Sequence, residues 1–494
     1  MIPRPLTEVA ALADAPAPAA GPEEPLVTSV VTDSRRAGAG SLFVAITGER
    51  TDGHAHVGSV ARAGGVAALV CDPDAARASL REAGLAEDAL TLLVVPDTVE
   101  ALGALARGHL ADLRRRAAAR GEALTVVGMT GSVGKTTTKD LTRQLLADQA
   151  PTVAPVASFN NEIGLPLTVL ETDESTRYLV LEMGASGPGH IAYLTDIAPL
   201  DAAAVLMVGH AHMGGFGSVA GVAAAKSEIV TGLTPTGTAL LNRDDPHALA
   251  MAGLAPATVL TFSAQGDPEA QVRATDVELG GDAHASFTLH LPGLAAPVRV
   301  RLALPGAHNV ANALAAAGLA VAAGADPAAV ARALGSARME SPHRMDVTEV
   351  RRTAADSSPL HLLLVDDSYN ANIDSMTAAL EALPTLAGGR RAVVVVSEML
   401  ELGESSVADH TRTGELAAQA GAAVLVTIGS GTRAAAAAAA AAGVDTIEVF
   451  DAQSAIAALD APDSPLRDGD VVLVKGSHGS GAWRVADHLK EAVR

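Results

Sequence analysis

Residues 124–138 form a short apolar run that leads into a glycine-rich turn and then into a lysine followed by three threonines. This order predicts a strand, a phosphate-binding loop and a helix, because the N–H groups of such a turn and the helix N-terminus together hold phosphate oxygens. A strand-to-helix unit of this kind belongs in a mostly parallel sheet flanked by helices. The alternative is a glycine-rich turn without a ligand, and the Gly-Lys-Thr-Thr-Thr ending argues against it.

The loop has a defined chemistry. We expect Lys135 to neutralise the β- and γ-phosphates of ATP and Thr136 to bind magnesium. The pattern is a variant of the common phosphate loop, because Met129 stands where the first glycine is usual and the glycine is residue 128. The predicted ATP-binding residues of the loop are Thr130, Gly131, Ser132, Val133, Gly134, Lys135 and Thr136.

Lysine is scarce in this chain, which has 35 basic residues but lysine only at positions 135, 139, 226, 475 and 490. Arginine therefore supplies the general positive charge, and a retained lysine can mark a place that needs a compact ammonium or an amine that forms a carbamate. Lys139 and Lys490 lie on predicted exposed helices, and we assign them no role.

Length and charge exclude several classes of protein. A chain of 494 residues predicts two to four domains. A net charge of −21 argues against nucleic acid or an anionic membrane surface as a general partner. The single cysteine, Cys71, excludes an internal disulfide and a cysteine-based zinc cluster. Because there is no signal-like start and no long apolar run, we expect a soluble cytoplasmic protein without membrane insertion.

The alternation of apolar runs and helical periods predicts an α/β protein of three domains. Residues 1–96 form a small N-terminal α/β domain. Residues 97–338 form the central ATP-binding domain, with a mostly parallel sheet and a small antiparallel appendage at about 257–305. Residues 339–494 form a C-terminal Rossmann-like domain.

Several polar residues follow apolar strands, where α/β sheets expose ligand-binding groups. Glu182 follows the strand predicted at 178–183 and either holds magnesium or faces solvent. Asp366 follows the strand predicted at 360–365, at a place that suits a ribose hydroxyl. Asn309 and Asn312 lie one helical turn apart and either read an adenine edge or cap their helix. His210 and His212 lie on a glycine-rich loop, and Lys226 on a helix, where local sequence favours exposed residues without a function.

Together these segments resemble the Mur ligases, the ATP-dependent amide-forming enzymes of peptidoglycan synthesis, over nearly the whole chain. The resemblance is carried by Thr-Asp-Ser-Arg at 32–35, Ser-Phe-Asn-Asn-Glu-Ile-Gly-Leu-Pro at 158–166 and above all Asp-Ser-Tyr-Asn-Ala-Asn at 367–372. These motifs are similar to the branch of the family that joins D-alanyl-D-alanine to UDP-N-acetylmuramoyl-tripeptide. That activity is therefore the expected one, with an acyl phosphate as intermediate and a monomer as the expected state.

The resemblance also implies roles for individual residues. Lys135, His212, Lys226 and Arg344 are the implied catalytic residues. Two magnesium ions are implied, held by Thr136, Glu182, His212 and Lys226, the last of them as a carbamylated lysine. Beyond the loop, the implied ATP contacts are Asn309, Asn312, Asp366 and Asn370. The implied contacts to the UDP-sugar peptide and the dipeptide are Ser34, Arg35, Asn160, Asn161, Lys475 and Ser477.

The chain departs from the family pattern at a few positions. Ile373 replaces a proline, Ser397 and Glu398 stand where Gly-Asp is usual, and His478 replaces an arginine. These departures concern the dipeptide end more than ATP chemistry. Two other functions remain as alternatives: a related ligase that adds glutamate to folate, and an ATP-binding protein without catalysis.

Overall fold

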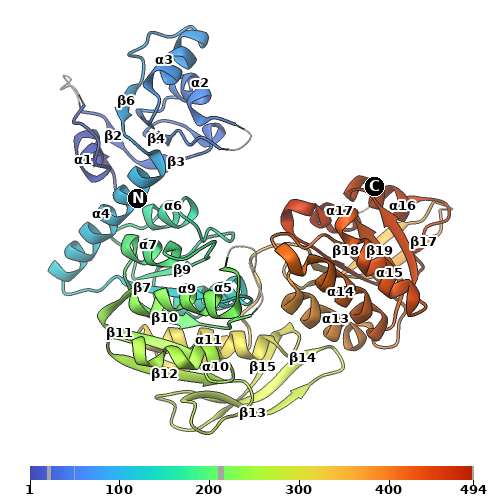
Figure 1. The fold of residues 1–494 in the computed structure, drawn as a ribbon. Helices are drawn as coiled ribbons and strands as arrows, with labels where there is room; N and C mark the ends of the chain where they lie inside the picture. The colour runs from blue at the N-terminus through green and yellow to red at the C-terminus, as the bar shows by residue number, and fades with distance from the viewer. Residues whose placement is uncertain (19–23, 49–50, 210–215, 356, 492–494) are drawn as a thin grey trace.

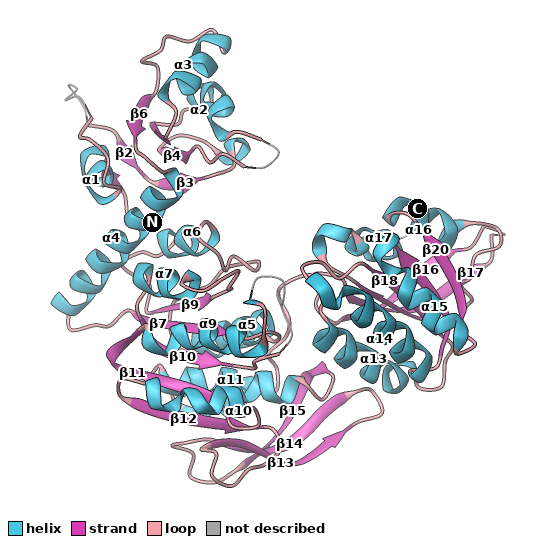
Figure 2. Cartoon of the chain, viewed as in Figure 1, coloured by secondary structure: helices cyan, strands magenta, loops and turns pink. Residues whose placement is uncertain are grey.

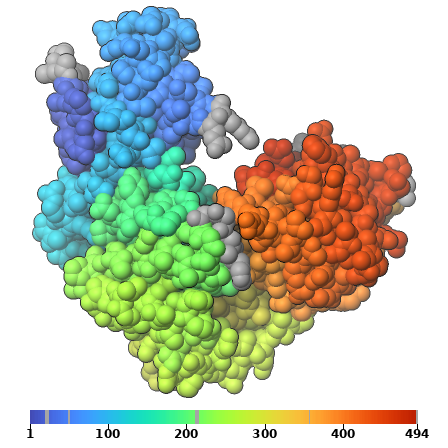
Figure 3. Space-filling view, viewed as in Figure 1, coloured from blue at the N-terminus to red at the C-terminus, as the bar shows by residue number. Residues whose placement is uncertain are grey.

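The computed structural model describes residues 1–18, 24–48, 51–209, 216–355 and 357–491, which form three α/β units (Figure 1). The first unit stands above the middle unit, and the C-terminal unit lies beside the middle one (Figure 2). In the space-filling view the first and C-terminal units stand apart, so the molecule is open between them (Figure 3). No helix among the described residues is long and apolar enough to cross a membrane.

The first unit is a parallel sheet of four strands in the order β3-β4-β5-β6, next to a small antiparallel pair, β1 and β2. Each strand is a short apolar run, and β4 and β5 are buried along their whole length. The strands are β1 (Arg4–Pro5), β2 (Leu26–Val27), β3 (Ser29–Val31), β4 (Ser41–Val44), β5 (Ala67–Val70) and β6 (Thr91–Val94). The helices are α1 (Leu6–Leu12), η1 (Ser34–Arg36), η2 (Gly53–His56), α2 (Val57–Arg62) and α3 (Pro73–Glu82).

The middle unit contains a sheet of nine strands in the order β15-β14-β13-β12-β11-β10-β7-β9-β8. All pairs from β8 to β13 are parallel, while β13, β14 and β15 pair antiparallel. The strands are β7 (Thr125–Thr130), β8 (Thr152–Val153), β9 (Tyr178–Glu182), β10 (Leu200–Val205), β11 (Leu233–Asn242), β12 (Thr258–Ser263), β13 (Val272–Leu279), β14 (His284–His290) and β15 (Val298–Pro305). The predicted antiparallel appendage is therefore an extension of the central sheet, because β13 pairs with β12.

Helices cover both faces of this sheet. Successive residues of β7 enter different cores: Val126 packs with α7 and α9, and Val127 packs with α5 and α11. This alternation explains why β7 is apolar at every inner position. The helices are α4 (Thr98–Ala119), α5 (Lys135–Ala147), α6 (Gly164–Leu170), α7 (His190–Ile197), α9 (Val219–Thr231), α10 (Pro246–Leu249), η3 (Ala250–Leu254), α11 (Asn309–Ala322) and α12 (Pro327–Leu334).

The long helix α4 joins the first unit to the middle unit. Its residues Leu102, Leu105 and Leu110 belong to the same apolar core as Leu42 of β4 and Leu179 of β9. The first unit therefore shares a continuous core with the middle unit rather than hanging from a linker.

The C-terminal unit has six strands in the order β16-β17-β21-β18-β19-β20, all parallel except β16. The central strand β18 is buried at every position, as expected of a sheet covered on both faces. The strands are β16 (Asp346–Thr353), β17 (Pro359–Asp367), β18 (Ala392–Ser397), β19 (Ala422–Ile428), β20 (Asp445–Val449) and β21 (Val471–Lys475). The helices are α13 (Ile373–Ala387), η4 (Gly403–Ser405), α14 (Ser406–Gln419), η5 (Ser430–Thr432), α15 (Arg433–Ala441), α16 (Ala452–Asp460), η6 (His478–Ser480) and α17 (Ala482–Lys490). The predicted α/β class and the three units are confirmed.

A buried polar cluster ties the N-terminus to α4 and gives a testable pH dependence. His109 donates from Nε2 to the carbonyl of Thr172 at 3.0 Å, and its Nδ1 accepts from Arg4 Nε at 3.3 Å. Burial lowers the pKa of His109 to about 4. Because the unfolded chain binds a proton near pH 6.5 and the folded chain does not, His109 makes stability fall as the pH drops from about 6.5 towards 4, by about 1.4 kcal/mol per pH unit.

We therefore expect the thermal midpoint to fall more steeply with acidification in the wild type than in His109→Gln, which does not titrate. Scanning calorimetry between pH 7.5 and 5 measures both slopes. Equal slopes for the two proteins would contradict this account of His109.

Candidate active site

The phosphate loop has the geometry that its sequence predicts. β7 ends at Thr130, and α5 begins at Lys135 after Gly134, whose φ of 85° is left-handed. A side chain at 134 would be strained by this φ, and its Cβ would lie 2.3 Å from Oδ1 of Asn312. Lys135 Nζ donates to the carbonyl of Gly131 at 2.8 Å. The lysine is therefore folded back along the loop that is expected to receive phosphates.

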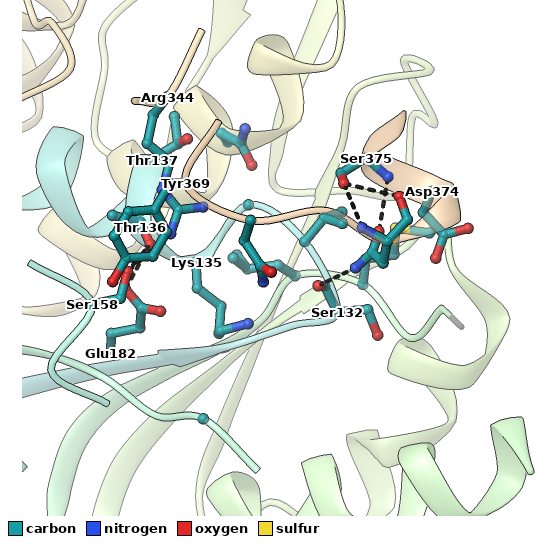
Figure 4. Close-up of a pocket in the computed structure, with 18 of the residues that line it drawn as sticks. Ser132, Lys135, Thr136, Thr137, Ser158, Glu182, Arg344, Tyr369, Asp374 and Ser375 are labelled. Carbon is teal, nitrogen blue, oxygen red and sulfur yellow. Dashed lines mark hydrogen bonds between the residues drawn. The ribbon is translucent and has the colours of Figure 1, made fainter. Parts of the chain in front are cut away.

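Glu182 lies at the end of β9 and is 1% exposed, so the interpretation as a solvent-facing carboxylate is wrong. Thr136 donates from Oγ1 to one of its oxygens at 2.9 Å, and Asn160 donates from Nδ2 to the other at 2.8 Å. Ser158 is within 2.9 Å of Thr136 Oγ1 and accepts from Arg344 Nη2 at 2.9 Å. Figure 4 shows Lys135, Thr136, Ser158, Glu182 and Arg344 gathered at this point.

The electrostatics of Lys135 suit an anionic ligand. Burial lowers the pKa of Lys135, the Glu182 carboxylate opposes that shift, and the Arg344 cation adds to it. A partly buried ammonium near a guanidinium gains most from a ligand that brings negative charge. The two cations therefore favour phosphate binding.

These groups line a cavity of about 630 Å³ between the middle and C-terminal units. The middle unit supplies the phosphate loop, the segment 158–162, Glu182 and the start of α11. The C-terminal unit supplies the loop after β17 and the end of β21. Of the predicted site residues, the cavity is lined by Ser132, Val133, Gly134, Lys135, Thr136, Asn160, Asn161, Glu182, Asn309, Asn312, Arg344, Asn370 and Lys475.

The two asparagines of α11 face this cavity rather than capping their helix. Asn312 donates from Nδ2 to Asn309 Oδ1 at 2.9 Å, and Asn309 donates to the carbonyl of Pro305 at 2.7 Å. Neither side-chain oxygen accepts an N–H of the first turn, as a cap would. The capping alternative is therefore not supported, and the contact with adenine stays a prediction.

At the end of β17 the structure separates two adjacent carboxylates. Asp366 is fully buried and pairs with Lys490 Nζ at 2.6 Å and His343 Nδ1 at 2.8 Å, away from the cavity lining. Asp367 lines the cavity and pairs with Lys475 Nζ, which also donates to the carbonyl of Asn370 at 3.2 Å. Successive strand residues face opposite sides. The structure thus brings Asp367 to the cavity in place of the expected Asp366.

Lys226 is not the exposed helical residue that local sequence favours. It is 4% exposed on α9. Its burial, together with the Lys135 cation, lowers the pKa of Lys226 to about 7. At pH 7 about half of an amine with this pKa is in the neutral form, which is the form that reacts with CO2. His212 and His210 lie outside the described residues.

The remaining predicted residues lie in different places. Ser34 and Arg35 form part of η1 in the first unit, where Arg35 is exposed and pairs with Asp33 at 2.7 Å, outside the cavity. Thr130 is the last residue of β7 and Gly131 follows it, and neither lines the cavity. Ser477 is buried and accepts the N–H of Leu400 at 3.0 Å, so it supports a loop and does not line the cavity.

Sequence reasoning missed several cavity residues, among them Ser158, Asp367 and Tyr369. The Tyr369 ring lies under the Arg344 guanidinium, 4.3 Å from its carbon, in a cation-π contact. Ser158 and Tyr369 stand within motifs that the resemblance already used, and this was the available signal for them.

The departures from the family pattern have local structural explanations. Ile373 begins α13 behind Asn372, whose capping box starts the helix without a proline. Glu398 accepts the N–H of Gly431 at 2.6 Å. The His478 ring stacks against Trp483 with centroids 5.5 Å apart and contacts Tyr369 at 5.4 Å. His478 therefore supports a cavity residue by ring packing.

Comparisons with known proteins identify the family of the chain. Three family models match: the Mur ligase family catalytic domain over residues 26–110, the Mur ligase middle domain over 129–320 and the Mur ligase glutamate ligase domain over 343–478. The UDP-N-acetylmuramoyl-tripeptide–D-alanyl-D-alanine ligase of Mycobacterium leprae is 39% identical over 94% of this chain and 93% of its own. The Escherichia coli enzyme of that name is 36% identical over 82% of both chains.

Solved structures match along the whole chain. A crystal structure of MurF from Acinetobacter baumannii superposes with a TM-score of 0.80 at 30% identity, covering 99% of both chains. MurF from Thermotoga maritima in complex with ADP has a TM-score of 0.72 at 26% identity, covering 94% of this chain and 97% of its own. The chain belongs to the Mur ligase family, in the branch of the UDP-N-acetylmuramoyl-tripeptide–D-alanyl-D-alanine ligases.

Proposed function

We propose that this protein is an ATP-dependent ligase that joins D-alanyl-D-alanine to UDP-N-acetylmuramoyl-tripeptide in the cytoplasmic stage of peptidoglycan synthesis. The observation that carries the proposal is the buried Thr136–Glu182 pair beside Lys135, in a cavity shared by the middle and C-terminal units. A hydroxyl and a carboxylate next to a phosphate loop suit a triphosphate bound with a hard cation. The named activity of relatives that match over most of this chain supports the same conclusion.

Each of the three units would contact a different part of the substrates. Ser34 and Arg35 of the first unit would contact the uridine end of the long nucleotide-sugar peptide, while Asn160 and Asn161 would meet its peptide end. The Asn309–Asn312 pair would contact adenine, and Asp367, one residue after the expected Asp366, would contact ribose. Lys475 would help to hold the dipeptide or the departing phosphate.

The donor atoms beside the phosphate loop suit magnesium. A hydroxyl and a carboxylate beside substrate phosphates are ligands of the kind that magnesium takes. Thr136 and Glu182 would hold one ion, and a carbamylated Lys226 with His212 a second. Such ions would neutralise charge on the transferred phosphoryl group.

The reaction follows from positioning and charge neutralisation and needs no protein nucleophile. The terminal carboxylate of the tripeptide attacks the γ-phosphate, which gives an acyl phosphate and releases ADP. The amine of the dipeptide then attacks the acyl carbon and loses a proton, and phosphate leaves. Lys135 and Arg344 would stabilise the charge on the phosphoryl oxygens, and closure of the C-terminal unit would exclude water.

Phosphate release by the purified protein tests the proposal. We expect turnover only when ATP, UDP-N-acetylmuramoyl-tripeptide and D-alanyl-D-alanine are all present, with magnesium. Tripeptides that end in meso-diaminopimelate, LL-diaminopimelate or lysine identify the accepted third residue. Turnover with glutamate and a folate instead, or ATP binding without turnover, would refute the proposal. Size-exclusion chromatography with light scattering tests the expected monomer.

A further inference from the structure

Lys139 and Asp140, one turn after Lys135 on α5, form a buried ion pair. Both residues are 1% exposed, and Lys139 Nζ lies 2.6 Å from Asp140 Oδ1. The expectation that Lys139 is an exposed helical residue without a role is therefore wrong. Lys490 is also half-buried, in its pair with Asp366. Of the two lysines, Lys139 is the one that lies next to the active site.

The pair binds two segments that are distant in sequence. Lys139 Nζ donates to the carbonyl of Pro155 at 2.8 Å and to Ser341 Oγ at 3.0 Å. Asp140 Oδ2 accepts the N–H groups of Glu340 at 3.0 Å and Ser341 at 2.8 Å, and Ser341 Oγ donates to Asp140 Oδ1 at 3.1 Å. We call Lys139, Asp140 and Ser341 the α5 anchor.

Burial of an ion pair is weak evidence for stability, since apolar residues of the same volume often stabilise a fold as well or better. A more specific use of such a pair is to select one arrangement of the chain among several. The α5 anchor holds the segment at residue 155 and the connection from the middle unit to the C-terminal unit. The residues that follow on these two segments should therefore indicate what the α5 anchor does.

Each held segment carries one partner of the same contact. Ser158 follows Pro155 by three residues, Arg344 follows Ser341 by three residues, and Arg344 Nη2 donates to Ser158 Oγ at 2.9 Å. Arg344 is the cation over Tyr369 of the C-terminal unit, and Ser158 contacts Thr136 of the phosphate loop. The α5 anchor therefore fixes the backbone at Pro155 and Ser341, three residues before the two side chains that meet at the cavity.

The connection also has a backbone that requires support. His343 and Met345, on either side of Arg344, have left-handed φ values of 60° and 47°. Non-glycine residues in this region cost about 1 kcal/mol or more each and persist when surrounding contacts hold them. The three hydrogen bonds that Asp140 accepts from residues 340 and 341 supply such contacts directly before this turn.

We propose that Lys139, Asp140 and Ser341 are positioning residues of the ligase reaction. They hold the connection and the 155–158 segment so that Arg344 and Ser158 meet beside the phosphate loop. The role in turnover rests on the proposed function. The role in holding the connection is independent of the proposed function, and the emission of Trp483 measures it.

Two variants test the anchor in the full-length protein. Lys139→Met removes the cation but keeps a side chain of similar length. Ser341→Ala removes one hydroxyl and is the milder change. Because misplacement of a catalytic group by about 1 Å can lower a rate about 100-fold, we expect kcat to fall about 10-fold or more in both. The KM for UDP-N-acetylmuramoyl-tripeptide should change less than kcat, because Ser34 and Arg35 of the first unit are untouched.

Arg4→Met is the matched control, because it breaks another buried ion pair, Arg4 of the first unit with Asp112 of α4 at 2.8 Å. It should lower the thermal midpoint and preserve kcat. Retention of wild-type kcat by folded Lys139→Met and Ser341→Ala would overturn the catalytic part of the proposal. Equal loss of kcat in Arg4→Met at a matched thermal midpoint would overturn it as well.

Trp483 gives a readout that needs no turnover. It is the only tryptophan of the chain, and its ring lies 6.2 Å from that of His343 in the held connection. We expect the Trp483 emission spectrum to shift in both anchor variants and to remain unchanged in Arg4→Met. Unchanged emission in the anchor variants would refute the inference. Absence of wild-type turnover would refute the proposed function alone.

Discussion

Lys226→Arg is expected to abolish turnover and to preserve the fold. Lys226 is buried on α9 outside the cavity lining, where the Lys135 charge still acts on it, and its pKa of about 7 leaves much of the amine neutral near neutral pH. A neutral amine adds to CO2 and loses a proton to give a carbamate, which replaces a cation with an anionic oxygen ligand. A guanidinium stays protonated and forms no such group. The variant therefore keeps a positive charge where the proposed metal site needs a negative one.

Phosphate release and the thermal midpoint measure the two parts of this prediction, and 13C NMR with labelled bicarbonate reports the carbamate directly. The carbamate resonance should appear in the wild type and be absent in Lys226→Arg. Lys490→Arg is the control, because this lysine acts through its charge on Asp346 and Asp366. Near-normal activity of Lys226→Arg would refute the carbamate role.

Lys135→Ala is expected to lower kcat/KM by a factor on the order of 10² to 10³, which corresponds to about 3–4 kcal/mol of transition-state stabilisation. The Lys135 ammonium lies against the phosphate loop at the carbonyl of Gly131, whereas the Arg344 guanidinium is held at Ser158, so Arg344 does not occupy the same place. Steady-state kinetics with ATP as the varied substrate and saturating dipeptide measure this loss of kcat/KM. An unchanged kcat/KM would contradict the assigned role.

The same variant should not be less stable than the wild type. Burial lowers the pKa of Lys135, so the folded protein holds a cation that would be more favourably solvated in the unfolded chain. Its removal should leave the thermal midpoint equal or higher, a trade between stability and activity. A large fall in the midpoint would mean that the activity loss reports unfolding instead.

The elements that sequence predicted well are those with strong local causes. The apolar run at 178–183, predicted as a strand, forms β9, and the glycines of the phosphate loop lie at the turn from β7 to α5. The antiparallel strands were also recognised, but their pairing with β12 was missed, because pairing depends on contacts between distant segments.

The site residues divide in the same way. The phosphate loop residues and Glu182 could be selected by motif and strand position. Asp366 was selected instead of Asp367, which lines the cavity. The two carboxylates are adjacent in the sequence, and adjacent residues of a strand lie on opposite faces of the sheet. Lys139 was missed because its partners, Pro155 and Ser341, lie 16 and 202 residues away.

The phosphate loop, the α/β class, the three units and the family could be predicted from the amino-acid sequence, because they depend on local backbone requirements and on motifs of adjacent residues. The three-dimensional arrangement was needed to show which lysines and carboxylates are buried, which of them face the cavity and what holds the connection to the C-terminal unit. These properties arise from register and packing between segments far apart in the chain, where desolvation and hydrogen-bond partners are set by neighbours that no local pattern names.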